Sequence, residues 1–360
     1  MPNEPTLSDS VMEGKGAYNK YAKLPAGGAA LALPLLERTA RNLEVDAGDH
    51  PVVIADYGSS QGKNSMIPMQ VAVKTLRNRM GPNRAISVFH IDQPSNDFNS
   101  LFGILDADPD RYSLNDSNVF PAAIGRSFYQ NVLPPGSVDL GWSSYAAVWL
   151  SRVPALIPGH FFSPHSTGSV RAKFDHQGAQ DWEAFLSLRA KELRIGGRLI
   201  VVLPALADDG LSGFENIMDQ ANAVLAEMVT AGSIQAEERA QMVLRSHLRR
   251  KRDLLAPFAR DAGFQQLIVE DLDTSMLPDA AWTDFERDGD REGLAAKHAS
   301  FFRSVFAPAL ASALDHVRSG DPEALRLFGD RLEAGLKRRL ASQPAPMHSF
   351  VQSLVLTKQF

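Results

Sequence analysis

Residues 51–65 read PVVIADYGSSQGKNS, an apolar run that ends in Asp56 and leads into a turn with two glycines. An apolar run without alternation is typical of a buried parallel strand, because both faces of such a strand are covered. Residues 65–80 follow at once and are predicted to be a helix. Gly58 permits a sharp turn and Gly62 lets a ligand approach the backbone, while the next helix offers free N–H groups to a polar or anionic ligand.

Similar apolar runs recur along the chain, and stretches with helical spacing separate them. Residues 181–193, for example, place Trp182, Phe185 and Leu186 at helical spacing. Strands that alternate with helices predict a doubly wound α/β sheet with right-handed crossovers, in which ligands bind beyond the carboxyl ends of the strands. The further predicted strands are residues 85–92, 137–142, 198–203, 266–270 and 350–357.

Two mostly helical blocks interrupt the late part of this pattern and predict a cap built from insertions. In the first block, Phe214, Ile217 and Met218 stand at helical spacing. The N-terminal residues include Gly14 and Gly16 and few apolar side chains, so we expect a lid there. The predicted division is a lid at 1–25, an α/β core at 26–206, 259–275 and 345–360, and a helical cap at 207–258 and 276–344.

The composition is that of an ordinary globular protein and excludes several kinds of site. The 360 residues are 44% hydrophobic and 22% charged, with a formal net charge of -5 and no cysteine. A chain without cysteine has no disulfide, thiolate zinc site, iron–sulfur cluster or cysteine nucleophile. The net negative charge argues against nucleic acid as a main partner. No apolar run approaches the ~18 residues of a membrane span, and the N-terminus has no secretory signal, so we expect a soluble, cytoplasmic protein without a membrane partner.

Asp92 ends the second predicted strand, where an acid can accept hydrogen bonds from both ribose hydroxyls of an adenosine cofactor. The alternative for Asp92 is an ordinary turn residue at the end of a strand. Together with Asp56 and the glycine turn, Asp92 suits either a nicotinamide cofactor or S-adenosylmethionine. The turn lacks the three-glycine fingerprint of dinucleotide sites, which favours S-adenosylmethionine.

Four segments, in order and at similar spacing, resemble the SABATH family of S-adenosylmethionine-dependent methyltransferases. These enzymes methylate the carboxyl groups of small acids and, in some members, ring nitrogens. The most specific pieces are NDFN and WLSRVP, and the resemblance extends over residues 11–205. The four segments are VMEGKG with KYAK (11–16 and 20–23), IADYGSSQGKNS (54–65), DQPSNDFNSLF (92–102), and GRSFY with SSYAAVWLSRVP (125–129 and 143–154).

The resemblance implies a Rossmann-like class I methyltransferase sheet with a helical cap, S-adenosylmethionine as the cofactor, a small acid as the substrate, and a homodimer. It implies that Asp56, Gly58 and Asn64 hold the methionine portion of the cofactor, that Asp92 binds the ribose, and that Phe128 stacks on the adenine. The implied cofactor-binding residues are Tyr21, Asp56, Gly58, Asn64, Asp92, Gln93, Ser127 and Phe128. The implied substrate-binding residues are Tyr21, Gly28, Tyr145, Val148 and Trp149.

Two substrate-facing positions depart from the family. The family's glutamine that helps hold the substrate carboxylate falls near Gly27 and Gly28, and its pocket histidine falls at Val148. A carboxylate, with a pKa near ~4, is already ionised at neutral pH, so its methylation needs no general base. We therefore expect conversion of a small acid to its methyl ester by in-line methyl transfer. Three alternatives stay open: N-methylation of a nitrogen heterocycle, cofactor binding without turnover, and a nicotinamide-dependent oxidoreductase.

Residues outside these motifs give weaker signals. His160 and His165 are five residues apart in a loop with proline and glycine, a poor ligand spacing on a helix or a strand, so no metal site is predicted. The basic run at 245–252 is expected to be a solvated helix face, with attraction of an anionic substrate or of a partner as the alternatives. Three phenylalanines at helical spacing are expected to pack inside the cap, or else to line the substrate pocket: Phe301, Phe302 and Phe306.

Overall fold

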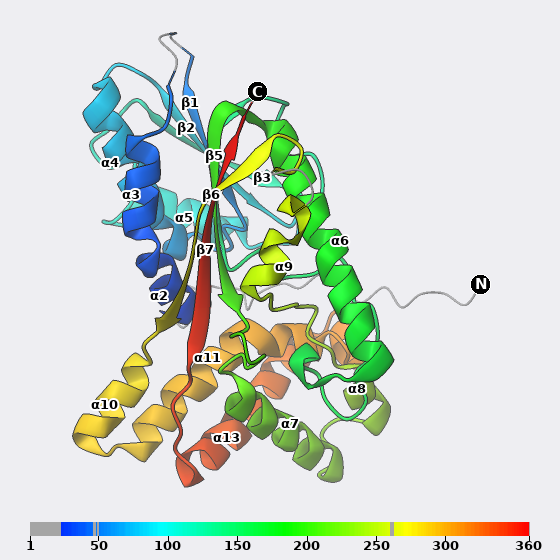
Figure 1. Ribbon diagram of the computed structural model, residues 1–360. Coiled ribbons are helices and arrows are strands. Elements are labelled where there is room, and N and C mark those ends of the chain that lie inside the picture. Colours follow the sequence, from blue (N-terminus) through cyan, green and yellow to red (C-terminus); the bar gives the residue numbers. More distant parts are fainter. Residues whose placement is uncertain (1–22, 46–47, 49, 260–262, 360) are drawn as a thin grey trace.

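The computed structural model describes residues 23–45, 48, 50–259 and 263–359 (Figure 1). Its centre is a seven-stranded sheet in the order β3-β2-β1-β4-β5-β7-β6. Strands β1 to β5 pair in parallel, whereas β7 runs antiparallel to β5 and β6. This arrangement confirms the predicted α/β class. The strands are β1 (Val52–Tyr57), β2 (Ile86–Asp92), β3 (Val119–Gly125), β4 (Val138–Ser144), β5 (Leu193–Ala205), β6 (Leu267–Leu277) and β7 (Ser349–Lys358).

Most of the predicted lid at 1–25 lies outside the described residues, and Tyr21 lies outside them too. The described chain begins with α2 (Lys23–Leu31) and continues into α3 (Leu33–Arg41). Only the first turn of α2 therefore belongs to the predicted lid. The role of Tyr21 stays a prediction.

Strand β3 was missed in the sequence. It lies at the edge of the sheet, beside β2. Pro121 removes one N–H donor from this strand, which an edge position tolerates because one side of the strand has no ladder partner. Phe120 and Pro121 are also exposed. The strand is therefore not covered on both faces. Its sequence, VFPAAIG, is apolar throughout, but a proline in the middle of an apolar run argues against a strand.

Helices cover both faces of the sheet, and successive strand residues point to opposite faces. Ile54 packs into the core beneath α2, α3, α4 (Lys63–Met80) and α5 (Phe98–Ala107). Its neighbour Ala55 packs into a second core on the other face, which α6 (Gly168–Glu192) covers. Figure 1 shows these two layers, with α3 and α4 on one side of the strands and α6 on the other. The predicted helix at 181–193 is thus the second half of a longer α6.

The cap gathers at one end of the sheet (Figure 1). Both predicted helical blocks contribute to it, and α13 packs against both α11 and α7. Strand β6 runs on to Leu277, so the second block begins later than residue 276. Within the described part of the chain, no helix combines the length and the apolar character that crossing a membrane requires. The cap helices are α7 (Glu215–Thr230), α8 (Ala236–Gln241), α10 (Ala280–Asp288), α11 (Arg291–Ala311), α12 (Asp315–Arg318) and α13 (Pro322–Ser342).

The basic run at 245–252 is not a solvated helix face, so that prediction is wrong. The run is extended up to the start of α9 (Lys251–Leu255). The guanidinium of Arg249 is buried and donates hydrogen bonds to the carbonyl oxygens of Ala147 and Gly178, each 2.8 Å away. A guanidinium is tolerated inside a protein when its donors meet such acceptors. Arg249 therefore ties this segment both to the loop after β4 and to α6.

Candidate active site

A cavity of about 430 Å³ lies where β1, β2 and β4 end. Gly58 follows β1, Asp92 ends β2 and Ser144 ends β4, and all three line this cavity. The carboxyl ends of parallel strands are the place where such a sheet binds ligands. Residues from three of the four family-like segments therefore meet here. Those that the sequence singled out and that line this cavity are Gly58, Asp92, Gln93, Ser127, Phe128, Tyr145 and Trp149.

The glycine turn after β1 presents its backbone to the cavity. Gly58 has a φ of +94°, a conformation that residues with a Cβ rarely adopt. A Cβ on Gly58 would also lie 2.1 Å from the Cβ of Ala146, so no side chain fits there. Ser60 lines the cavity, and its buried Oγ has no hydrogen-bond partner in the described chain. A buried hydroxyl without a partner fits a site that a polar ligand completes.

The carboxylate of Asp92 is shared between the turn and the cavity. Its Oδ2 accepts a hydrogen bond from the backbone N–H of Ser60, and its Oδ1 accepts one from that of Gln93, both at 2.7 Å. Burial raises the pKa of Asp92 to about 6, and the nearby carboxylate of Asp56 adds to this rise, while the two N–H groups oppose it. Each carboxylate oxygen has a second lone pair. Asp92 can therefore also accept hydrogen bonds from a vicinal diol.

Two of the implied cofactor residues, Asp56 and Asn64, are not among the described residues that line the cavity. Oδ2 of the buried Asp56 lies 2.9 Å from Nδ1 of His90, and Nε2 of His90 lies 2.9 Å from the hydroxyl of Tyr112. Asn64 lies in the first turn of α4. Asp56 thus acts on the cavity through its charge on Asp92, and the assignment of Asp56 and Asn64 to the methionine portion stays a prediction.

The ring of Phe128 packs against two other aromatic side chains. It meets Phe185 edge-on at 5.9 Å and the tilted ring of Tyr129 at 4.8 Å. The hydroxyl of Tyr129 in turn donates a hydrogen bond to the backbone oxygen of Trp149 at 2.7 Å. Edge-on and tilted contacts of this kind are favourable for aromatic rings. Phe128 is therefore held at the cavity as a flat wall on which an adenine can stack.

A smaller, apolar cavity of about 60 Å³ adjoins the first. Tyr145 and Trp149 line both cavities. The cap closes the smaller one, with Met218 of α7 and with Phe301 and Phe306 of α11. Two of the three phenylalanines thus take the pocket position that was the alternative in the sequence, whereas the fully buried Phe302 packs inside the cap. The other lining residues are Leu24, Pro25, Val148, Phe162, Pro204, Phe214, Ser246, Leu248 and Val305.

The two positions that depart from the family lie beside this smaller cavity. A Cβ on Gly28 would lie 2.2 Å from the hydroxyl oxygen of Tyr145, so the phenol occupies the space that a side chain at residue 28 would need. Tyr145 itself has a φ of 58°, a strained conformation for a residue with a Cβ, and its N–H donates to the oxygen of Val202 at 2.8 Å. Val148 adds an apolar wall. Where the family has the amide of a glutamine and the imidazole of a histidine, this chain thus has the phenol of Tyr145 and the methyl groups of Val148.

The sequence did not predict the lining residue Arg245. It contributes a cationic side chain to the larger cavity, whose other lining residues are neutral except for Asp92. The backbone oxygen of Arg245 accepts a hydrogen bond from the N–H of Leu150 at 2.8 Å, and Ser246 bridges to Trp149. Residues 242–249 do not alternate between apolar and polar side chains, so no strand-like pattern in the sequence marks Arg245. Further lining residues that the sequence did not single out are Ser60, Pro94, Asn96, Tyr129, Gln130, Ser144, Ala146, Leu150 and Ser151.

Comparisons with known proteins agree with one another about the family. The model of a family described as SAM dependent carboxyl methyltransferase matches residues 8–354. Methyltransferase FUS9 of Gibberella fujikuroi is 31% identical over 237 residues, which make up 65% of this chain and 63% of that protein. Salicylate carboxymethyltransferase of Clarkia breweri is 28% identical over 280 residues, 74% of each chain. The chain spans a little under two thirds of the length of the fungal relatives it matches.

A solved structure, loganic acid methyltransferase with SAH, has the same fold. Its TM-score is 0.74 at 21% sequence identity, and the match covers 97% of this chain and 99% of that one. The sheet is therefore the Rossmann-like class I methyltransferase sheet that the resemblance implied. The match to the family model, rather than the fold, removes the nicotinamide-dependent alternative. Because the family model covers nearly the whole chain, the protein belongs to the SABATH family of S-adenosylmethionine-dependent carboxyl methyltransferases, and S-adenosylmethionine is its cofactor.

Proposed function

We propose that the protein methylates the carboxylate of a small apolar acid, giving the methyl ester and S-adenosylhomocysteine. When bound, S-adenosylmethionine supplies an electrophilic methyl group on its sulfonium. A carboxylate oxygen forms the new bond to this methyl group while the sulfur–methyl bond breaks, so no proton has to move. The chain therefore needs no general base, and its own contribution is to align two ligands and to exclude water.

One observation carries this proposal: Tyr145 and Trp149 line both cavities. A cofactor over Asp92 and Phe128 and an acid in the apolar cavity meet at these two side chains. The hydroxyl of Tyr145 and the indole N–H of Trp149 are donors, and a carboxylate accepts hydrogen bonds from such groups. Because a carboxylate without partners is costly in an apolar site, donors at this point are what the reaction requires.

The apolar walls favour an acid with a hydrocarbon body. Phe301 and Phe306 of α11 and Met218 of α7 face the cavity, and the cavity is small. Closing such walls around the acid removes water from the carboxylate and strengthens its hydrogen bonds to the two donors. A charged group elsewhere on the substrate would have no oppositely charged partner among the described residues that line this cavity.

N-methylation of a nitrogen heterocycle is the second candidate. It is favoured by Gly28 and Val148, which leave the site with fewer hydrogen-bonding groups than the family's usual carboxylate site. A neutral heterocycle needs no charged or strongly polar partner in an apolar cavity. The two candidates therefore differ in the atom that receives the methyl group, and product analysis distinguishes them.

The experiment is a panel of small acids and nitrogen heterocycles incubated with labelled S-adenosylmethionine, with the products identified by mass spectrometry. We expect at least one acid to give its methyl ester. Trp149→Phe keeps most of the ring but removes the donor, and we expect kcat for that acid to fall about tenfold, or ~1.4 kcal/mol of transition-state stabilisation.

Trp282→Phe is the matched control, because Trp282 lies on α10 outside the residues that line either cavity and donates to Glu286 at 2.8 Å. It should leave kcat unchanged. Methylation of a heterocycle and of no acid would make N-methylation the function. Cofactor binding without any methylated product would leave the chain as a cofactor-binding protein.

A further inference from the structure

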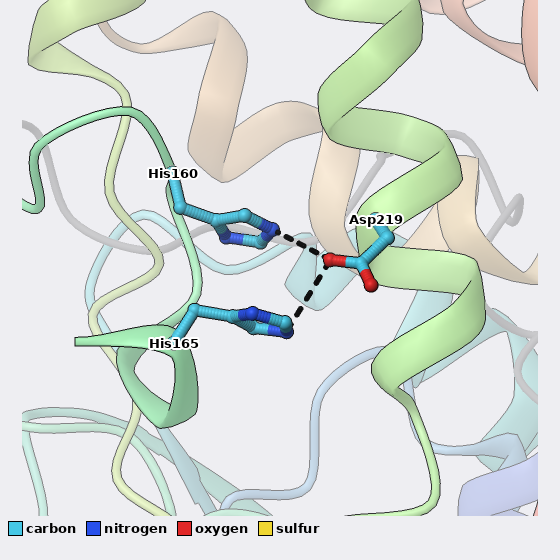
Figure 2. A group of neighbouring side chains, drawn as sticks. All are labelled: His160, His165 and Asp219. Carbon is cyan, nitrogen blue, oxygen red and sulfur yellow. Dashed lines mark ion pairs between the residues drawn. The ribbon is translucent and has the colours of Figure 1, made fainter.

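A group of three side chains outside the residues that line the two cavities joins the cap to the core. His160 and His165 lie in the loop between β4 and α6, and Asp219 lies on α7 (Figure 2). The Nε2 atoms of both histidines face the same oxygen, Oδ1 of Asp219. In the part of the chain that the structure describes, no other set of histidine, aspartate and glutamate side chains brings three ligand atoms within 4.8 Å of one another.

Two of the distances in this cluster match those between ligands of one ion. Oδ1 of Asp219 lies 3.4 Å from Nε2 of His160 and 3.5 Å from Nε2 of His165. Both are long for an N–H···O hydrogen bond, whose usual N···O distance is about 2.9 Å. In a tetrahedral zinc site with bonds of about 2.0–2.2 Å, two ligand atoms are roughly 3.4 Å apart. The spacing thus suits two ligands of one ion better than a hydrogen-bonded pair.

Burial makes the cluster unusual as a metal-free group. The side chain of His160 is only 10% exposed, that of His165 27% and that of Asp219 54%. Both Nε2 atoms are buried and lack a hydrogen-bond partner in the described chain. Polar atoms in such a position normally have a partner. An ion between the two rings and the carboxylate would satisfy both nitrogens at once.

The rings have to turn to bind such an ion together. Their centroids are 4.2 Å apart and their planes are 12° from parallel. Since the lone pair of a ring nitrogen lies in the plane of its ring, both Nε2 atoms of His160 and His165 reach one ion only after the stack opens. The half-exposed side chain of Asp219 has room to follow. Binding therefore changes the environment of both rings, which is measurable.

We propose that His160, His165 and Asp219 bind one divalent transition-metal ion, and that Zn²⁺ fits the site. Two imidazoles and a carboxylate are zinc ligands, whereas Mg²⁺ and Ca²⁺ take oxygen ligands. Water completes the tetrahedron. The five-residue spacing of the histidines did not predict this site because the third ligand comes from the cap.

The ion would stabilise the positions of two residues that line the apolar cavity. Phe162 lies between the two histidines in sequence, Met218 precedes Asp219, and both Phe162 and Met218 line that cavity. None of the three ligands lines either cavity among the described residues. The ion would therefore lie outside both cavities and fix α7 of the cap against the loop after β4, beside the place where an acid would bind.

The test uses the full-length protein freed of metal by a chelator. It is titrated with Zn²⁺ by calorimetry and with Co²⁺ by visible absorption, which reports tetrahedral coordination. We expect one equivalent of Zn²⁺ to bind and to raise the unfolding temperature. His165→Gln and Asp219→Asn should lose the bound equivalent and the cobalt bands. His176→Gln and Asp208→Asn, which change an exposed histidine and an exposed aspartate elsewhere, should keep both.

Far-ultraviolet circular dichroism establishes that each variant is folded before titration, and the wild-type result stands without any variant. The proposal is overturned if the wild-type protein takes up no Zn²⁺, or if His165→Gln binds it as tightly as His176→Gln does. The cluster is then a metal-free histidine pair beside a carboxylate. These titrations use neither a methyl donor nor an acid, so their outcome is independent of the proposed methyl transfer.

Discussion

Among single residues, Asp92 has two roles, both of which depend on its carboxylate. It holds the turn after β1 through the N–H of Ser60, and it faces the cavity with its remaining lone pairs. Because burial raises its pKa to about 6, its charge is lost in mildly acidic solution. A ligand that donates hydroxyl groups to Asp92 favours the ionised form, so ligand binding and proton binding oppose each other.

We expect the affinity for S-adenosylhomocysteine to fall as the pH drops below about 6, because protonation of Asp92 removes an acceptor. Calorimetry at pH 7.5 and pH 5 should show a roughly tenfold difference, since pH 5 lies about one unit below this pKa. At pH 7.5, Asp92→Ala should weaken binding by ~1.5–3 kcal/mol, and its affinity should no longer depend on pH in this range. Asp106→Ala, an exposed change on α5, should behave as the wild type. Unchanged affinity in a folded Asp92→Ala protein would falsify the ribose assignment.

Among the elements, the extended segment before α9 joins three parts of the fold. Arg249 connects it to the loop after β4 and to α6. Arg249→Ala removes two buried hydrogen bonds from a charged donor to backbone oxygens, so we expect the free energy of unfolding to fall by about 3 kcal/mol. Urea unfolding followed by fluorescence measures this. Arg252→Ala is the control, because that side chain is 76% exposed, and the prediction fails if the two variants lose equal stability.

The elements also show which features the sequence could predict. Gly58 and Asp92 were predicted because strand ends and turns are local, and parallel strands bring those ends together. Phe128 was implied only by the family resemblance, because it follows the strand that was missed. Strand β3 was missed because Pro121 stands inside its apolar run, and proline argues against a strand unless the strand lies at the edge of a sheet. Arg245 was misassigned because a run of basic residues looks solvated, whereas most of residues 242–249 are buried by the packing of the fold.

Most of the features that the sequence did not predict depend on contacts between residues far apart in the chain. Asp219 approaches His160 and His165 only through the packing of the cap, and no spacing in the chain reports such packing. In the same way, the sequence placed Gly28 where the family has a glutamine, but it did not show that the phenol of Tyr145 fills the space. The lining of the larger cavity follows in good part from local motifs, whereas the lining of the apolar cavity depends on how the cap meets the sheet.

At the scale of the whole molecule, we expect the cap to determine the affinity for the acid and the sheet to determine the affinity for the cofactor. Of the two described cavities, Phe306 of α11 lines the apolar one and not the larger one. Phe306→Ala enlarges that cavity, so we expect KM for the acid to rise about tenfold, equivalent to ~1.4 kcal/mol, with unchanged affinity for S-adenosylhomocysteine. Phe285→Ala, also in the cap but lining neither cavity, should change neither constant. An equal loss of both affinities in Phe306→Ala would contradict this separation. The homodimer implied by the resemblance stays a prediction.

The wall that Tyr145 and Trp149 form between the two cavities has a thermodynamic consequence. Two ligands that contact the same side chains share the entropic cost of ordering those side chains. Once the first ligand has bound, the second ligand binds without that cost. Their affinities are then linked: the factor by which the cofactor tightens binding of the acid equals the factor by which the acid tightens binding of the cofactor. For the proposed acid, the protein with cofactor bound and the protein without it would therefore be two different receptors.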